Sequence, residues 1–167
     1  MKKNRQSGVS IKGMIMTTRF TDETWDQHVR WREQHMKKGC IYLTPRVIAQ
    51  NIPYNKVLYV IEMNNTTNQI MGIGVITNAC SKPRSIYSER NYNRFTYTGP
   101  TRIDRSELTH VVDVGGYRVK LIKILEAVCF KGSTHSKRTT GITKLPQAVL
   151  DNSYIDFNAT LQEIMRV

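Results

Sequence analysis

The stretch KVLYVIEM (residues 56–63), NNTTNQ (64–69) and IMGIGVITN (70–78) decides the fold. Its first and last parts are apolar and rich in β-branched residues, and the six residues between them are typical of turns. We therefore predict two strands joined as a β-hairpin. Gly72 and Gly74 fall on one face of the second strand, where a missing side chain lets another backbone or a flat ligand approach closely.

Short strands and helices are predicted on both sides of this hairpin. Thr21 caps a helix that Gly39 ends, because Asp22 and Glu23 follow in its first turn and apolar residues recur at helical spacing. The other predicted elements are strands at GCIYLT (39–44), SIY (85–87) and RFTYTG (94–99), and helices at PRVIAQN (45–51), Tyr117–Phe130, PQAVLDNS (146–153) and YIDFNATLQEIMRV (154–167). The sum is an α+β fold: a small, mostly antiparallel sheet, curled into a partial β-barrel and flanked by helices.

The length and composition are those of one globular domain. The chain has 167 residues, of which 40% are hydrophobic, enough to bury a core without disulfides or metals. Residues 1–12 carry four cations and no acid, so we predict a flexible basic arm there and a single domain over residues 13–167. No window is long and apolar enough to cross a bilayer, and no secretory signal is evident. We expect a protein that is intracellular and not secreted, with no membrane partner; nucleus, cytoplasm and virus particle remain open.

The three cysteines are Cys40, Cys80 and Cys129. Their number is odd, their spacing is wide, and their neighbours are apolar, as in GCIYL and AVCF. These features argue against a disulfide framework. We predict that all three are reduced residues of the core.

The charge balance indicates an anionic partner. The chain has 25 Lys and Arg against 13 Asp and Glu, a formal net charge of +12, which costs self-repulsion unless a polyanion is bound. Nucleic acid is the commonest such partner. No cofactor is predicted.

One candidate binding segment covers residues 82–105, where cations and aromatic rings alternate. Guanidinium groups neutralise phosphate and an aromatic face stacks on an unpaired base. The predicted phosphate contacts there are Arg84, Arg90, Arg94, Arg102 and Arg105, and the predicted base contacts are Tyr92 and Tyr97. The alternative, in which the aromatics are core residues and the arginines a solvated face, stays open.

A second candidate segment is the loop of residues 131–144. It has no acidic residue, and its glycines and hydroxyl side chains offer donors beside the charges, as a phosphate-binding loop requires. It does not match the P-loop motif. The predicted phosphate contacts are Lys131, His135, Lys137, Arg138 and Lys144.

No catalytic or metal site is predicted. His28 and His35 are seven residues apart on one predicted helix, but no further ligand completes a metal set. His110, Asp113 and Glu107 are close enough in sequence to form an acid–base pair, yet no nucleophile accompanies them. We therefore do not expect an enzyme.

Residues 38–78 resemble the central part of PUA-like domains, particularly the YTH and EVE branches. The resemblance is carried by KGCIYLTP (38–45), VLYVIEMNN (57–65) and QIMGIGVI (69–76). It implies a curled β-barrel flanked by helices and an RNA or DNA ligand with one flipped or modified base in a pocket. It also implies that Tyr42 stands where YTH domains carry a cage tryptophan, and that Asn64 or Asn65 lies near the pocket. The chain departs from the pattern because no tryptophan follows Trp31, so Tyr92 or Tyr97 would have to substitute.

Three functions are compatible with these features. The first is a nucleic-acid-binding module that reads a base in an aromatic pocket beside a basic groove. The second is a structural nucleoprotein or assembly subunit that neutralises phosphate without reading a base. The third is a nucleic-acid-processing enzyme that depends on His110, Asp113 or Glu107. The choice between RNA and DNA is left open, because the 2′-hydroxyl contact that separates them is a geometric detail.

Overall fold

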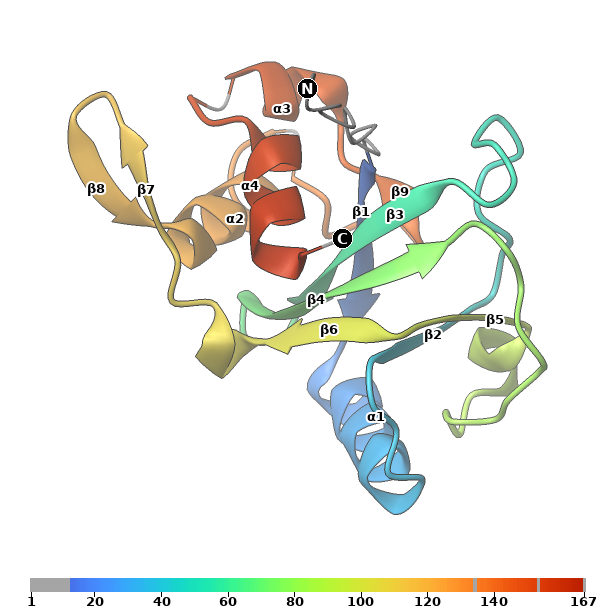
Figure 1. The fold of residues 1–167 in the computed structure, drawn as a ribbon. Coiled ribbons are helices and arrows are strands. Elements are labelled where there is room, and N and C mark those ends of the chain that lie inside the picture. The colour runs from blue at the N-terminus through green and yellow to red at the C-terminus, as the bar shows by residue number, and fades with distance from the viewer. Residues whose placement is uncertain (1–12, 134, 153, 167) are drawn as a thin grey trace, which may run out of the picture.

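The computed structural model describes residues 13–133, 135–152 and 154–166 (Figure 1). The predicted basic arm, residues 1–12, lies outside this part of the chain. In chain order the elements are β1 (Met14–Phe20), α1 (Asp22–Gln34), β2 (Cys40–Thr44), β3 (Val57–Asn64), β4 (Gln69–Thr77), the 3₁₀ helix η1 (Arg90–Asn93), β5 (Phe95–Gly99), β6 (Thr101–Asp104), the 3₁₀ helix η2 (Arg105–Glu107), β7 (Val111–Val114), β8 (Tyr117–Lys120), α2 (Leu121–Phe130), β9 (Thr143–Lys144), α3 (Gln147–Asn152) and α4 (Phe157–Met165).

A five-stranded sheet forms the centre of the molecule, in the order β6-β4-β3-β1-β9. The predicted hairpin is confirmed as β3 and β4, which pair antiparallel from Val57 opposite Thr77 to Asn64 opposite Gln69. β1 has no predicted counterpart. It lies parallel to β3, with Met14 opposite Leu58, and thereby places the beginning of the described chain in the middle of the sheet.

A second sheet consists of β2 and β5, which pair antiparallel. Only Pro100 separates β5 from β6, so one stretch of chain pairs first with β2 and then with β4. Gly99 lies at this crossing, where an added Cβ would overlap the carbonyl oxygen of Val75. The predicted α+β class with mostly antiparallel strands is confirmed, and the described strands form no closed barrel.

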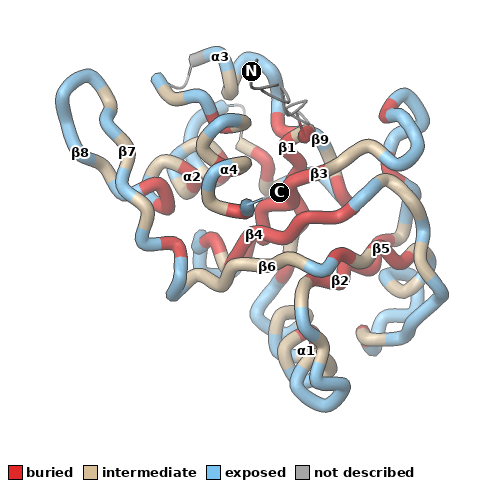
Figure 2. The backbone as a smooth tube through the Cα atoms, in the orientation of Figure 1, coloured by how far each residue is buried: buried red, intermediate tan, exposed pale blue. Residues whose placement is uncertain are grey.

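Two hydrophobic cores lie on opposite faces of the five-stranded sheet. Along β3 the side chains alternate: Tyr59 and Ile61 belong to the core that α2 and α4 cover, whereas Leu58 and Val60 belong to the core shared with β2 and β5. Figure 2 shows that β3 and β4 are buried along most of their length. Burial on both faces explains why β3 reads as an unbroken apolar run.

Helix α1 begins as predicted and ends earlier than predicted. The Thr21 hydroxyl accepts a hydrogen bond from the Thr24 N–H, and the Thr24 hydroxyl accepts one from the Thr21 N–H. The helix ends at Gln34, and Met36 has a positive φ of 46°. The prediction that Gly39 ends it is therefore wrong.

None of the described helices combines the length and apolar composition that a bilayer crossing needs.

The prediction of one helix over Tyr117–Phe130 is wrong at its beginning. Residues 117–120 form β8, which pairs with β7, and α2 begins at Leu121. Gly115 and Gly116 have φ of 59° and 88°, the left-handed values that a two-residue hairpin turn needs. Val119 stands at helical spacing to the residues that follow, but its pairing with β7 places it in a strand.

Two further predictions fail because side chains hold local backbone. PRVIAQN forms no helix, since the Ile48 N–H donates to Tyr97 Oη at 3.1 Å. SIY forms no strand, since the N–H groups of Ile86 and Tyr87 both donate to Asn93 Oδ1 at 3.0 Å.

Of the free cysteines, Cys40 and Cys129 are buried as predicted, whereas Cys80 is exposed. The predicted short helix after Pro146 and the terminal helix are confirmed as α3 and α4.

Candidate functional site

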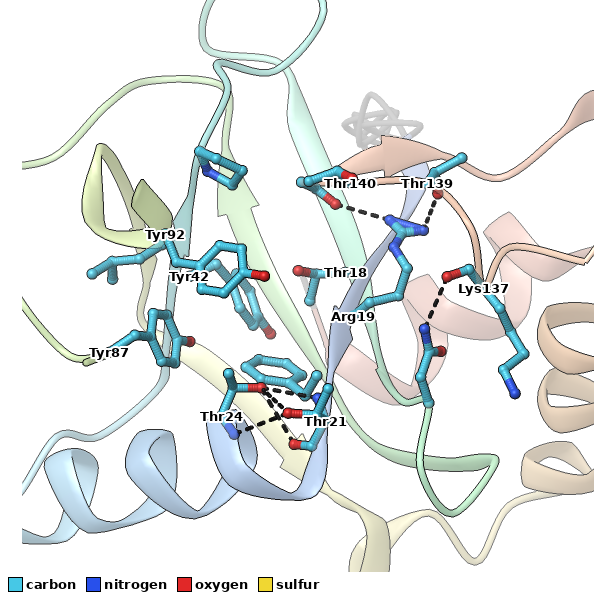
Figure 3. A pocket seen from close by; sticks show the side chains of 15 residues that line it. Thr18, Arg19, Thr21, Thr24, Tyr42, Tyr87, Tyr92, Lys137, Thr139 and Thr140 are labelled. Carbon is cyan, nitrogen blue, oxygen red and sulfur yellow. Dashed lines mark hydrogen bonds between the residues drawn. The ribbon is translucent and has the colours of Figure 1, made fainter. Parts of the chain in front are cut away.

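A cavity of about 200 Å³ opens between β1, the beginning of α1, β2, η1 and the loop before β9 (Figure 3). We call it the tyrosine pocket. Its lining residues come from five separate parts of the chain: Thr18, Arg19, Phe20, Thr21, Thr24, Tyr42, Leu43, Pro45, Asn65, Tyr87, Tyr92, Lys137, Thr139, Thr140 and Gly141.

Aromatic rings form one side of the tyrosine pocket. Tyr42 lies on β2, Tyr92 on η1 and Tyr87 on the segment before η1. The Tyr87 and Tyr92 rings meet edge to face, with centroids 6.3 Å apart, and Phe20 adds a fourth ring at the end of β1. Tyr92 is 40% exposed, whereas Tyr42 and Tyr87 are buried. The pocket therefore has three buried rings and one ring at its mouth.

A buried ion pair fixes Tyr42. Its hydroxyl donates to Glu62 Oε1 at 2.8 Å, and burial, followed by the nearby carboxylate of Glu62, raises the pKa of Tyr42 well above its usual value. Gly74 makes room for this arrangement, because a Cβ built there would overlap the Tyr42 hydroxyl. The predicted close approach at Gly74 is thus taken by a tyrosine of the chain itself.

Arg102 is the cation of this ion pair, which contradicts its predicted contact with phosphate. Its Nε donates to Glu62 Oε1 at 2.8 Å and its Nη2 to Glu62 Oε2 at 2.6 Å. Nη1 donates to Asp104 Oδ2 at 3.0 Å, and the guanidinium lies over the Trp25 ring. The Arg102 side chain is only 5% exposed and Glu62 is fully buried. Every charged donor of Arg102 is therefore occupied inside the protein.

His28 supports Tyr87 from behind. Its Nδ1 lies 3.2 Å from Tyr87 Oη, and its ring stacks on Trp25 with centroids 5.4 Å apart. Burial, followed by the positive charges of Arg32 and Arg102, lowers the pKa of His28 to about 3. The imidazole is neutral at physiological pH, and its Nε2 has no hydrogen-bond partner among the described residues. His28 is thus a buried support for the pocket, not the metal ligand considered with His35, which is exposed and stacks on Trp31.

We expect this histidine to make the fold sensitive to acid. The unfolded chain binds a proton at His28 below about pH 6.5 and the folded chain only below about pH 3, so the free energy of unfolding falls as pH falls through this window, by up to about 1.4 kcal/mol per pH unit. Urea unfolding of the wild type and of His28→Gln, followed by tryptophan fluorescence at several pH values, measures the difference. Parallel pH profiles for the two proteins would contradict the assignment; His35→Gln is the exposed control.

Arg19 holds the opposite wall of the pocket, a residue for which the sequence offered no signal. Its guanidinium donates to the carbonyl oxygens of Ser136 and Gly141, both at 2.8 Å, to Thr143 Oγ1 at 2.9 Å, and to the hydroxyl of Thr139. Burial lowers the pKa of Arg19 to about 10, so the group remains charged near neutral pH. One half-buried side chain on β1 therefore fastens residues 136–143 beside the aromatic rings.

Asn65 lines the pocket and joins its two walls, because its backbone N–H donates to the Phe20 carbonyl oxygen and its side chain contacts the loop. Its Nδ2 donates to the Lys137 carbonyl oxygen at 2.9 Å, which fixes the orientation of the amide, and its Oδ1 has no partner among the described residues. Asn64 does not reach the pocket lining. It is buried, its Oδ1 accepts from the N–H groups of Thr66 and Thr67, and its Nδ2 donates to Asp22 Oδ1. Asn64 therefore shapes the β3–β4 turn.

Tyr97 is also separate from the tyrosine pocket, which contradicts its predicted base contact. It lies opposite Tyr42 in the β2–β5 pair, but it is 2% exposed and its hydroxyl accepts the Ile48 N–H. Tyr97 shares one face of this pair with Tyr42 and packs in the same core, but it does not reach the pocket lining.

The predicted phosphate contacts fall into three groups. Arg84, Arg90, Arg94 and Arg138 are exposed; Arg90 and Arg94 flank Tyr92, and Arg138 lies between two lining residues. Lys137 lines the pocket, and its Nζ donates to Asn68 Oδ1 at 2.7 Å. The remaining four residues lie away from the pocket lining. Lys131 and Lys144 are exposed, and the His135 Nδ1 accepts a hydrogen bond from the Lys137 N–H. Arg105 forms an ion pair with Glu126 at 2.6 Å and donates to the Ile70 carbonyl oxygen.

The electrostatics of the tyrosine pocket are one-sided. Its lining includes Arg19 and Lys137 and no carboxylate. Exposed Arg46 follows the lining residue Pro45 and adds to the arginines beside Tyr92 and Lys137. Such a site attracts anions and disfavours cations.

The acidic residues considered for catalysis are occupied by local turns. Glu107 Oε2 accepts the Asp104 N–H, and Asp113 Oδ1 accepts the Gly116 N–H. Within the described residues, no three His, Cys, Asp or Glu side chains gather as metal ligands would.

Comparison with known proteins adds no relative. The chain matches none of the protein-family models, curated proteins or solved structures with which it was compared.

Proposed function

We propose that the protein binds nucleic acid and holds one base in the tyrosine pocket. The observation that carries the proposal is an aromatic pocket of about 200 Å³ whose lining has two cations and no carboxylate. Stacking on an aromatic ring contributes about 1–3 kcal/mol per base. The exposed arginines beside the pocket supply charges for the flanking phosphates.

The charge of the lining decides between two kinds of aromatic site. Aromatic cages also bind quaternary ammonium groups and methylated lysines. A cationic ligand would here meet Arg19 and Lys137 with no compensating carboxylate in the lining, in a chain of net charge +12. A neutral base attached to an anionic backbone suits the site better.

The likeness to PUA-like domains is part of this proposal. Support comes from the position of Tyr42 and Asn65, which both line the pocket as the resemblance implies. The curled arrangement in which β5 and β6 pass from β2 to β4 is compatible with a partial barrel. Tyr92 is then the ring that replaces the missing tryptophans. It is joined by Tyr87, which was not among the predicted base contacts.

Truncation of Tyr92 tests base binding without disturbing the buried network. We expect Tyr92→Ala to weaken binding of single-stranded oligonucleotides by about 1–3 kcal/mol, and to leave the salt dependence unchanged because no charge is lost. Tyr54→Ala is the matched control, since Tyr54 is 77% exposed and does not line the pocket. Fluorescence anisotropy at two salt concentrations measures both.

The result also separates base reading from charge neutralisation alone. If Tyr92→Ala and Tyr54→Ala bind like the wild type, and heparin competes as well as any oligonucleotide, the protein is a structural nucleoprotein without a base pocket. Arg138→Ala is expected to lower the salt slope by about one in either case. Absence of any binding at low salt would refute nucleic-acid binding altogether.

A further inference from the structure

The hairpin β7–β8, which we call the arm (residues 111–120), stands apart from both sheets. Its two strands pair with each other and with no other described strand. Figure 1 shows it projecting beyond α2 and α4, and Figure 2 shows that it has no buried segment. Since an isolated two-stranded hairpin is marginally stable in water, a surface that covers the arm is expected.

The arm has two different exposed faces. In the register of the pair, Val112 lies opposite Val119 and Val114 opposite Tyr117, so these four share one face, and Arg118 and Lys120 lie on the other. None of these residues belongs to either hydrophobic core. Tyr117, beside the turn, is 76% exposed.

The charge of the arm favours an anionic partner. Arg118 and Lys120 are exposed at alternate positions of β8, and Lys123 continues the series in the first turn of α2 with its side chain 66% exposed. The arm has one carboxylate, Asp113, and its Oδ1 is engaged by the Gly116 N–H at 2.9 Å. Lys123 lies 3.6 Å from Glu126 Oε2, whereas Arg118 and Lys120 form no ion pair among the described residues, although Asp113 lies opposite Arg118. These two cations can meet phosphate, and the aromatic tip can meet bases.

The size of the arm favours nucleic acid over a second copy of the chain. Four residues per strand, at about 3.4 Å each, and a strand separation of about 4.8 Å give a face on the order of 150 Å² or less. A stable protein interface buries about 800 Å² per partner. The major groove of B-form DNA, about 12 Å wide, admits a two-stranded ribbon, whereas the major groove of A-form RNA is too narrow.

We propose that the arm is a second nucleic-acid contact, which enters the major groove of a DNA duplex whose extruded base occupies the tyrosine pocket. This inference rests on the proposed function and narrows its ligand to duplex DNA. Duplex binding then depends on the arm, and binding of a short single strand depends on the pocket alone.

The test compares two triple variants of equal charge. The arm variant combines Tyr117→Ala, Arg118→Ala and Lys120→Ala. The control variant combines Tyr54→Ala, Arg30→Ala and Lys38→Ala, three exposed residues that do not line the pocket. The ligands are a DNA duplex with one mismatched pair, which lowers the cost of base extrusion, its single strand, and an RNA duplex.

We expect the arm variant to lose roughly tenfold or more in affinity for the DNA duplex, with the salt slope lowered by about two. Its affinity for the single strand is expected to match that of the control variant. An equal loss on duplex and single strand, or a wild type that prefers the RNA duplex, would overturn the role of the arm while the Tyr92 result still stands. A dimeric wild type that the arm variant converts to a monomer in sedimentation would also overturn it.

Discussion

Glu62→Ala is expected to destabilise the fold by about 3–5 kcal/mol, because it leaves the buried guanidinium of Arg102 without its principal counter-charge. Glu62 is fully buried and accepts three hydrogen bonds, two from Arg102 and one from Tyr42. Removing it also frees the Tyr42 hydroxyl that faces it. Urea unfolding followed by tryptophan fluorescence gives the change in free energy, and a loss below about 1 kcal/mol would mean that the ion pair is not buried as described.

A double variant distinguishes the effect of the lost ion pair from the effect of the cavity that Glu62→Ala leaves. Replacing both partners with apolar residues, Glu62→Leu with Arg102→Met, removes the charges together and is expected to recover most of the stability. The Tyr42 hydroxyl then lacks its acceptor, so oligonucleotide binding is expected to remain weaker than wild type even where stability returns. Recovery of both properties would show that the network has no role in placing the Tyr42 ring.

Arg19→Met is expected to have the second largest effect, and on both stability and binding. The substitution removes charged hydrogen bonds to two carbonyl oxygens and two hydroxyl groups of residues 136–143. Hydrogen bonds to charged groups contribute about 1.5–3 kcal/mol each, so we expect a loss of at least about 2 kcal/mol. Because this loop is one wall of the tyrosine pocket, oligonucleotide affinity is expected to fall roughly tenfold or more, which corresponds to about 1.4 kcal/mol.

Arg138→Met is the matched control for Arg19. It removes a charge of the same sign from the loop that Arg19 contacts, but Arg138 is exposed. The control is expected to keep the stability of the wild type and to lose only a phosphate contact. Limited proteolysis within residues 136–143 should then increase in Arg19→Met alone. If the two variants behave alike in stability, proteolysis and affinity, Arg19 does not hold the wall.

Local pattern predicted the hairpin and missed its neighbour in the sheet. β3 and β4 are rich in β-branched residues and are separated by a polar turn, so the sequence predicted where each strand begins and ends. β1 contains Thr17, Thr18 and Arg19, and its side chains are nearly all buried whatever their polarity. A strand between two others, parallel to β3 and covered on both faces, has no alternation to show.

The predicted site residues also fall into those that line the pocket and those that do not. Tyr42, Tyr92, Asn65 and Lys137 were predicted and line one pocket, whereas Tyr97, Asn64, Arg102 and Arg105 are held inside the fold or at its turns. A list of cations and rings does not tell which side of a strand each one takes. Tyr87, Phe20 and Arg19 could be found only once β1 and η1 were placed beside β2.

The sequence by itself determined the α+β class, the central hairpin, the cap of α1, the two C-terminal helices and the basic character of the chain. These features depend on local backbone preference, on apolar spacing and on counts of charge, all of which short windows carry. Only the tertiary structure decided which cations are free. Arg19 and Arg102 contact residues at least 40 positions away in the chain. Such pairing depends on the packing of distant strands, which no local window encodes.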